Sequence, residues 1–202
     1  MSLKLSEWNG TELTSECEIE SVMITNDVSG QAAEDVVIKK SVLDKASFSG
    51  VDLFRLYLTK SQIVSSDFSN ARLEESCVKN VSIENTRLTG VQLIEGNIQN
   101  LRVKNSKLNL ASFRSSKLKN VTFEDCILEG ADFQGAELKN ATFRNCDLRT
   151  VDFSHATFQR VDIRGSQVEG VALPFEQFSQ LTVGTSQAVY LASVMGLSIN
   201  DL

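Results

Sequence analysis

The sequence predicts an all-β solenoid, a stack of short β-coils with one side for every five residues. Three observations support this prediction. Large apolar residues recur at every fifth position from Ile38 to Leu173, 28 in all. A second series, small or apolar, lies two positions earlier, from Val36 to Val171. All 35 charged residues between positions 36 and 175 fall in the other three positions of each five-residue unit.

The period of five excludes ordinary helices and strands. On an α-helix, five residues advance by about 500°, so the large residues would spiral around the whole surface. On a continuous strand, residues five apart would point to opposite faces. Two residues spaced two apart can instead share one short side, and the next pair can do the same after a corner. Stacked coils then pair their backbones at about 4.8 Å and bury the large residues in ladders.

The repeated unit resembles the A(D/N)LXX signature of the pentapeptide-repeat family. Its closest matches are Ala131–Gly135, Ala136–Asn140 and Val151–His155. The resemblance implies a right-handed quadrilateral β-helix with four units per coil of 20 residues. It covers residues 36–175, which would form about seven coils.

The C-terminal end is similar to that of bacterial pentapeptide-repeat proteins, including quinolone-resistance types that protect DNA gyrase. The similar segments are Asp162–Gly165, Gly170–Val171 and Gln187–Leu197. In that subset this end commonly forms a homodimer. The resemblance therefore implies a dimer contact made by apolar residues of the last segment: Val189, Leu191, Met195, Leu197 and Ile199.

The ends should cap the solenoid, because open coils expose unpaired backbone and core. Residues 1–35 form an acidic cap, in which the inward pattern is out of phase and a loop is expected within Thr25–Asp35. Residues 176–202 form the second cap. Pro174 cannot donate a ladder hydrogen bond, and Thr185–Met195 predicts a short helix with a hydroxyl N-cap and Gly196 as its stop.

With coils of 20 residues, the outward charges separate onto different sides. A basic side collects Lys39, Lys40, Lys60, Lys79, Lys117, Lys119, Lys139 and Arg160 against Glu137. An acidic side collects Asp52, Glu74, Glu75, Glu95, Asp132 and Asp152 against Arg55, Arg72 and Arg114. Both sides are candidate interaction surfaces. The overall charge of −6 comes from the ends, because the body from 36 to 175 holds 19 basic and 16 acidic residues.

No catalytic, cofactor or metal motif is found, so we expect neither an enzyme nor a cofactor. The single histidine, His155, occupies an outward position. Cys126 and Cys146 should stack in neighbouring coils, close enough for a disulfide, although two reduced thiols filling small positions fit better. Four asparagines 20 residues apart predict a hydrogen-bonded ladder along one edge: Asn80, Asn100, Asn120 and Asn140.

Two functions remain open. The first is a rigid protein-interaction scaffold, non-catalytic, cytoplasmic and homodimeric, whose partner the sequence does not identify. The second follows from the family resemblance: a mimic of DNA that binds DNA gyrase or topoisomerase IV and protects or inhibits it. Mimicry needs carboxylates spread along the rod, since duplex DNA carries one charge per about 1.7 Å. We expect no nucleic acid on the basic side and no membrane segment.

Overall fold

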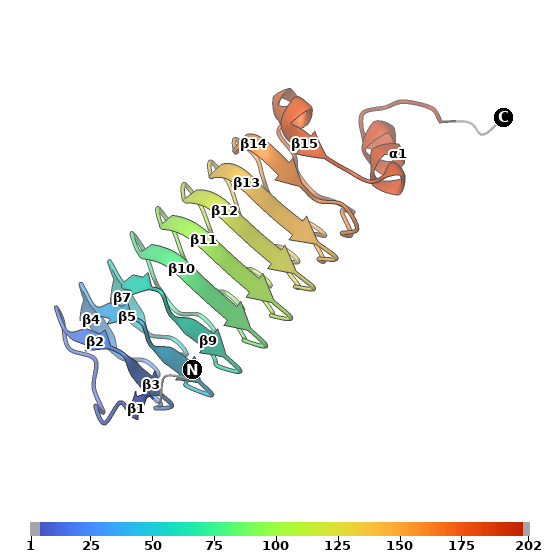
Figure 1. The fold of residues 1–202 in the computed structure, drawn as a ribbon. Coiled ribbons are helices and arrows are strands. Elements are labelled where there is room, and N and C mark those ends of the chain that lie inside the picture. The colour runs from blue at the N-terminus through green and yellow to red at the C-terminus, as the bar shows by residue number, and fades with distance from the viewer. Residues whose placement is uncertain (1–4, 200–202) are drawn as a thin grey trace.

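The chain folds as the expected right-handed quadrilateral β-helix, seen in Figure 1 as a straight stack of coils between a blue N-terminal and a red C-terminal end. The computed structural model describes residues 5–199. All strand pairs are parallel, and ten strands follow one another along one side in the order β1-β3-β6-β9-β10-β11-β12-β13-β14-β15. These ten strands define nine turns, an axis of about 43 Å at the usual strand spacing.

Most strands are short because each coil turns a corner every five residues, whereas β10 to β13 run through a corner and have eight residues each. Their bounds are β1 (Ser6–Glu7), β2 (Glu18–Glu20), β3 (Val22–Ile24), β4 (Ala32–Glu34), β5 (Val37–Lys39), β6 (Val42–Asp44), β7 (Asp52–Phe54), β8 (Tyr57–Thr59), β9 (Gln62–Val64), β10 (Cys77–Glu84), β11 (Asn97–Lys104), β12 (Lys117–Glu124), β13 (Glu137–Arg144), β14 (Thr157–Asp162) and β15 (Leu181–Thr182). A 3₁₀-helix, η1 (Phe175–Gln180), and the helix α1 (Thr185–Val194) complete the C-terminal end.

The register between coils is 20 residues, as the pairs Cys77 with Asn97 and Lys117 with Glu137 show. Each coil therefore has four five-residue sides, and each residue lies above the one 20 positions earlier. The last residue of most units adopts a left-handed conformation, with φ between 48° and 61° at the non-glycine corners. Asparagine and glycine tolerate this conformation best, which accounts for their frequency at the corners.

The core is a set of ladders along the axis. Phe113, Phe133 and Phe153 stack with ring centroids 4.7 and 5.0 Å apart, and the neighbouring pair Phe123 and Phe143 stacks at 5.1 Å. All five rings are almost completely buried. Every coil thus buries its large residues against the coils above and below it.

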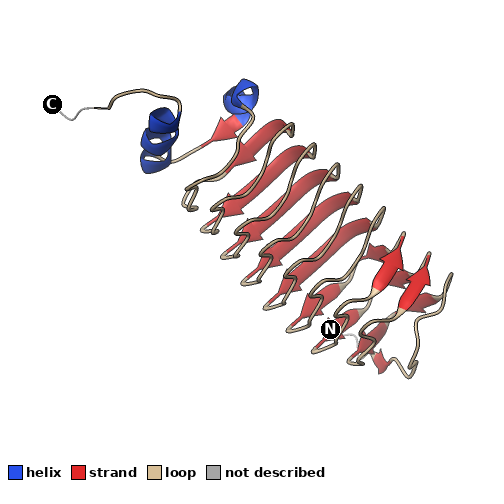
Figure 2. Cartoon of the chain, turned by 180° about the vertical axis from the view of Figure 1, so that it is seen from behind, coloured by secondary structure: helices blue, strands red, loops and turns tan. Residues whose placement is uncertain are grey.

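The prediction of a loop within Thr25–Asp35 is wrong, because this segment forms two further sides of the solenoid. Asp27 pairs with Ser47, and β4 pairs with β7 in a small second sheet that faces the viewer in Figure 2. Val28 and Ala33 take the inward positions. The five-residue pattern shifts because one residue is missing between the inward positions Ile24 and Val28. As a result, β2 pairs with β5, and β3 with β6, in a register of 19 residues instead of 20.

Two polar side chains concealed this continuation in the sequence. Asn26 and Gln31 occupy positions that are small or apolar elsewhere. Asn26 donates to the carbonyl oxygen of Gly10 at 3.1 Å. Gln31 accepts from the amide of Leu13 at 2.8 Å and donates to the carbonyl oxygen of Thr11 at 3.0 Å. Both amides therefore fasten the N-terminal segment across the first coil.

The C-terminal helix is confirmed, but its expected hydroxyl cap is wrong. Gly184 is the N-cap residue and has no side chain to offer; its amide donates to Gln187 Oε1 at 2.7 Å. Gly196 ends the helix as expected, with φ at 87°. Its amide donates to the carbonyl oxygen of Ser193, and the next amide, of Leu197, donates to that of Ala192. This is the paired arrangement of a Schellman motif.

Candidate functional site

The sides of the solenoid are the candidate interaction surfaces. The 20-residue register places outward residues in columns along the axis, so the charge pattern of the sequence becomes a pattern of sides. Lys39, Thr59, Lys79, Gln99, Lys119, Lys139 and Gln159 form one such column, each paired with the next. The basic residues predicted to share a side therefore do so, and we name this surface the basic side.

The N-terminal end of the basic side is neutralised, a feature that the sequence pattern did not reveal. β2 continues this side one coil further and brings Glu18 and Glu20 beside β5. Glu20 lies 3.2 Å from Lys39 Nζ and 2.8 Å from Lys40 Nζ, and Glu18 also pairs with Lys39. Hydrogen bonds from Lys40 and Lys39 hold the pKa of Glu20 below its ordinary value, and Glu18 and Glu20 raise the pKa of Lys39.

The rest of the basic side keeps its charge uncompensated. Among residues 5–199 no carboxylate lies within 4.0 Å of five of its cations: Lys60, Lys79, Lys119, Lys139 and Arg160. The one acid on this stretch, Glu137, approaches Lys117 at 3.7 Å. A shallow hollow of about 220 Å³ lies here, lined by Asn97, Gln99, Lys117, Leu118, Lys119, Glu137 and Lys139.

The predicted asparagine ladder borders the basic side. Asn100 donates to Asn80 at 2.8 Å, Asn120 to Asn100 at 3.0 Å, and Asn140 to Asn120 at 2.8 Å. All four residues lie at a left-handed corner. The ladder thus serves as a structural edge, as expected. It uses one side-chain N–H group of Asn100, Asn120 and Asn140 and none of Asn80, so every amide keeps an N–H group for other partners.

The acidic side also forms, but its arginines are drawn into ion pairs. Asp52, Arg72, Gln92, Ser112, Asp132 and Asp152 make one column. Arg55 pairs with Asp35 at 2.6 Å and Glu34 at 3.2 Å, and a hydrogen bond from Arg55 lowers the pKa of Asp35. Arg72 lies 3.5 Å from Asp52, and Arg114 lies 3.6 Å from Asp132. The predicted residues Glu74, Glu75 and Glu95 lie on the same side.

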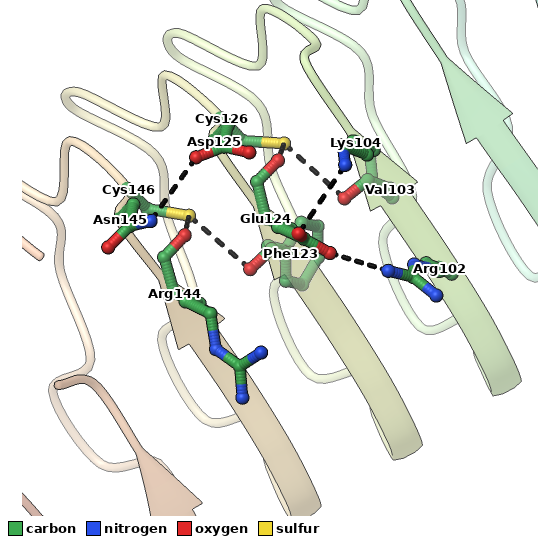
Figure 3. A network of polar contacts seen from close by, with 10 residues as sticks. All are labelled: Arg102, Val103, Lys104, Phe123, Glu124, Asp125, Cys126, Arg144, Asn145 and Cys146. Carbon is green, nitrogen blue, oxygen red and sulfur yellow. Dashed lines mark hydrogen bonds and ion pairs between the residues drawn. The ribbon is translucent and has the colours of Figure 1, made fainter. Parts of the chain in front are cut away.

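Cys126 and Cys146 stack in neighbouring coils, as predicted, and both are free thiols in this structure (Figure 3). Cys126 Sγ lies 3.5 Å from the carbonyl oxygen of Val103, and Cys146 Sγ lies 3.5 Å from that of Phe123. The contact with Cys126, together with burial, raises the pKa of the Cys146 thiol far above its usual range. A buried, protonated thiol is a poor nucleophile.

The outer surface beside these cysteines carries an ion-pair cluster. Glu124 lies 2.6 Å from Arg102 and 3.5 Å from Lys104, and Figure 3 shows all three on neighbouring coils. His155 is exposed at a corner near Asp152. Within residues 5–199 no group of three or more histidine, cysteine or acidic side chains is placed to hold a metal ion. No helix of the same range is long and apolar enough to span a membrane.

The C-terminal segment places most of its predicted contact residues at the surface. Val189, Met195, Leu197 and Ile199 are exposed. The prediction that Leu191 contributes to a dimer contact is wrong, because this residue is only 8% exposed and packs inside the protomer. Helix α1 turns Leu191 towards the last coil, where it lines an apolar hollow of about 190 Å³ with Phe178, Leu181, Val183, Ala188, Ala192 and Met195.

Comparison with known proteins agrees with this geometry. Residues 116–191 match the family model described as the pentapeptide repeat region, which confirms the resemblance drawn from the repeat units. No curated protein matches the chain. The solved structure of QnrB1, described as a plasmid-mediated fluoroquinolone resistance protein, superposes with a TM-score of 0.50 at 15% identity, over 95% of each chain. At this identity the likeness shows a shared fold.

A second solved structure matches with a lower TM-score. HetL, a pentapeptide repeat protein involved in heterocyst differentiation regulation from the cyanobacterium Nostoc, aligns at 15% identity with a TM-score of 0.31. The alignment covers 83% of this chain and 87% of HetL.

Proposed function

We propose that this pentapeptide-repeat solenoid is a non-catalytic, rigid scaffold that binds another protein through one of its flat sides. The observation that carries the proposal is the pair of continuous sides with opposite charge on a single rod of nine turns. The basic side belongs to the 13-stranded parallel sheet, and parallel bridges join the acidic side from coil to coil. The side chains of both sides are therefore preorganised for binding. Complementary charge supplies specificity and fast association more than affinity.

The absence of catalysis in this proposal rests on the chemistry of the polar residues. A general base needs a partner group within hydrogen-bond reach and a place for substrate. His155 is exposed at a corner, and Cys126 and Cys146 are buried among backbone carbonyl groups. A reducing compartment such as the cytoplasm would keep the four cysteines as free thiols.

The proposal includes a homodimer formed by the C-terminal segment. Val189, Met195, Leu197 and Ile199 are exposed apolar residues within eleven positions at the C-terminal end of the described chain. Exposed apolar residues gathered in one segment are typical of an interaction surface. Among the residues that the structure describes, β15 is an edge strand that pairs with β14 alone. Light scattering at several protein concentrations tests this part, and a monomer at all of them would contradict it.

The alternative function is DNA mimicry directed at DNA gyrase or topoisomerase IV. It is favoured by the C-terminal similarity and by the fold shared with QnrB1, a fluoroquinolone resistance protein. The charge pattern argues against it, since arginines interrupt the acidic side and pair with its carboxylates at 2.6 to 3.7 Å. A gyrase supercoiling assay separates the two functions. Inhibition, or protection from a quinolone, at micromolar protein would favour mimicry over the scaffold.

The scaffold is tested by capture of a partner from cells of the source organism. The bait is the full chain, beside two variants whose changes in net charge are equal in size and opposite in sign. The basic-side variant is Lys79→Glu, Lys119→Glu and Lys139→Glu; the acidic-side variant is Glu75→Lys, Glu95→Lys and Asp152→Lys. We expect one protein to be retained by wild type and lost with one variant only. Equal retention by all three baits, or no specific protein, would contradict the proposal.

A further inference from the structure

The basic side differs from the acidic side in how its charge is distributed. From Lys60 to Arg160 it carries six basic residues and one acid, Glu137, whereas arginines interrupt the acidic side. Glu137 lies 3.7 Å from Lys117. Among the described residues, no carboxylate lies within 4.0 Å of the ammonium groups of the column Lys79, Lys119 and Lys139. Eight described cations of residues 36–175 have no carboxylate within 4.0 Å, and five of these eight lie on this one side.

The asparagine ladder beside these lysines presents mostly donors. The ladder uses the side-chain oxygens of Asn80, Asn100 and Asn120 as acceptors, so the amide N–H groups that remain point to other partners. Lysine ammonium groups are donors only. A partner that satisfies this strip must offer acceptors and negative charge, and carboxylates offer both.

The spacing of the strip fits an α-helix. Successive coils are about 4.8 Å apart, so Lys79 and Lys139 are separated by about 14 Å along the axis. Three turns of an α-helix advance about 16 Å. A helix lying along the rod could thus present one acidic side chain per turn to nearly every coil, and the flexible lysine stems would absorb the difference of about 2 Å.

Features that recognise nucleic acids are sparse on the same side. Single strands bind on aromatic platforms, and the one exposed aromatic residue here among the described ones, Tyr57, lies at the N-terminal end of the strip. Bidentate phosphate recognition favours arginine, and Arg160 alone is available, at the opposite end. An acidic protein element fits this side better than a nucleic acid.

We propose that the basic side binds an α-helix of a partner protein that carries acidic side chains one turn apart. This inference rests on the proposed scaffold function and names the partner class and the side that receives it. The strip is formed by the column Lys79, Lys119 and Lys139 with its flanking asparagine ladder.

The test is binding of a labelled helical peptide to the full-length chain by fluorescence anisotropy. The probe carries glutamates one turn apart along a single face. A second peptide has the same composition with its glutamates spread around the helix, and a single-stranded oligonucleotide of equal charge serves as the third probe. We expect the first peptide to bind at least about tenfold more tightly than the other two, and binding to weaken as salt rises.

Two triple variants locate the contact. Lys79→Glu, Lys119→Glu and Lys139→Glu should weaken peptide binding at least about tenfold. Lys45→Glu, Lys107→Glu and Arg144→Glu make the same change in net charge on other sides, and should change it less than about threefold. Circular dichroism confirms folding, and lysine-to-glutamine variants replace any protein that does not fold.

Equal binding of both peptides, equal loss in both triple variants, a preference for the oligonucleotide, or no binding would each overturn the inference. The capture experiment tests the scaffold function separately from this inference. If a cellular partner is captured by wild type and by the basic-side variant but is lost with the acidic-side variant, the scaffold stands and this inference fails. If the peptide binds as described and no cellular partner is found, the scaffold fails.

Discussion

Gln187 Nε2 donates to the carbonyl oxygen of Ile163 at 2.7 Å, across 24 residues of chain. The same amide group donates to the carbonyl oxygen of Ser166 at 2.7 Å, while Gln187 Oε1 accepts from Gly184. Gln187 is buried on α1, and nearby Tyr190 Oη accepts from the amide of Gly170. One helix therefore satisfies backbone groups that the last coil cannot pair with a further coil.

We predict that Gln187→Ala weakens the docking of α1 by about 2 kcal/mol, because two buried carbonyl groups lose their donor. Hydrogen exchange of residues 185–194 measures this loss directly. Gln180→Ala, at an exposed position of η1, should leave exchange unchanged and provides the control. Unaltered protection in Gln187→Ala would show that apolar contacts alone hold the helix.

We predict that Phe133→Ala lowers the free energy of unfolding by about 3–5 kcal/mol, the usual cost of a large cavity in a packed core. The ring is fully buried and stacks on both Phe113 and Phe153. Urea denaturation followed by circular dichroism gives the value. Phe175→Ala, at a residue 58% exposed, should cost much less, and equal losses would contradict the ladder of stacked rings.

Leu110 occupies a left-handed corner, with φ at 58° and 68% of the residue exposed. A branched apolar side chain gains little there, and the backbone conformation costs about 1–2 kcal/mol for residues other than glycine and asparagine. We therefore expect Leu110→Asn to stabilise the protein by about 1 kcal/mol. The thermal midpoint should rise. Ile127→Asn, which removes an exposed apolar residue from a strand position, should not raise it.

The ion pairs of the outer surface predict a loss of stability in acid. Arg102 and Lys104 hold the pKa of Glu124 below its ordinary value of 4.5, and Arg164 lowers that of Asp162. A carboxyl group whose pKa is lower in the folded state stabilises the fold above its unfolded pKa and loses that contribution as pH falls. The free energy of unfolding should therefore decrease between about pH 5 and pH 3.

Glu124→Gln checks this cause, because it removes one titrating group while keeping its size. The decrease in acid should be shallower in this variant than in wild type. Glu95→Gln serves as control, since Glu95 has no cation within 4.0 Å among the residues described. A decrease of equal size in wild type and Glu124→Gln would assign the acid sensitivity to other carboxyl groups.

The regular part of the solenoid could be predicted from the sequence because one rule governs it. Inward positions such as Phe133 and Ala131 must be apolar or small in every coil, and outward positions inherit their side from the 20-residue register. The basic and acidic sides could therefore be predicted from the same 20-residue spacing. The ladder from Asn80 to Asn140 followed as well.

The ends could not be predicted in the same way, since they depart from the rule for local reasons. Asn26 and Gln31 are polar at otherwise small or apolar positions because they bond to the N-terminal segment. Because these two positions are polar, the shift caused by the one missing residue before Val28 resembled an inserted loop in the sequence. Leu191 was expected at a dimer contact, but the position of α1 buries it. That position depends on Gln187 and Tyr190, whose long-range bonds leave no periodic signal.

Photo-crosslinking from one position on each side is the most direct test of a scaffold that binds through the basic side. A photoreactive residue would replace Gln99 on the basic side, Gln92 on the acidic side, and Thr142 or Asn109 on the remaining two, in living cells of the source organism. Our account predicts that one protein is crosslinked from Gln99 and from none of the other three positions. Crosslinks of equal yield from all four sides, or none from Gln99, would contradict it.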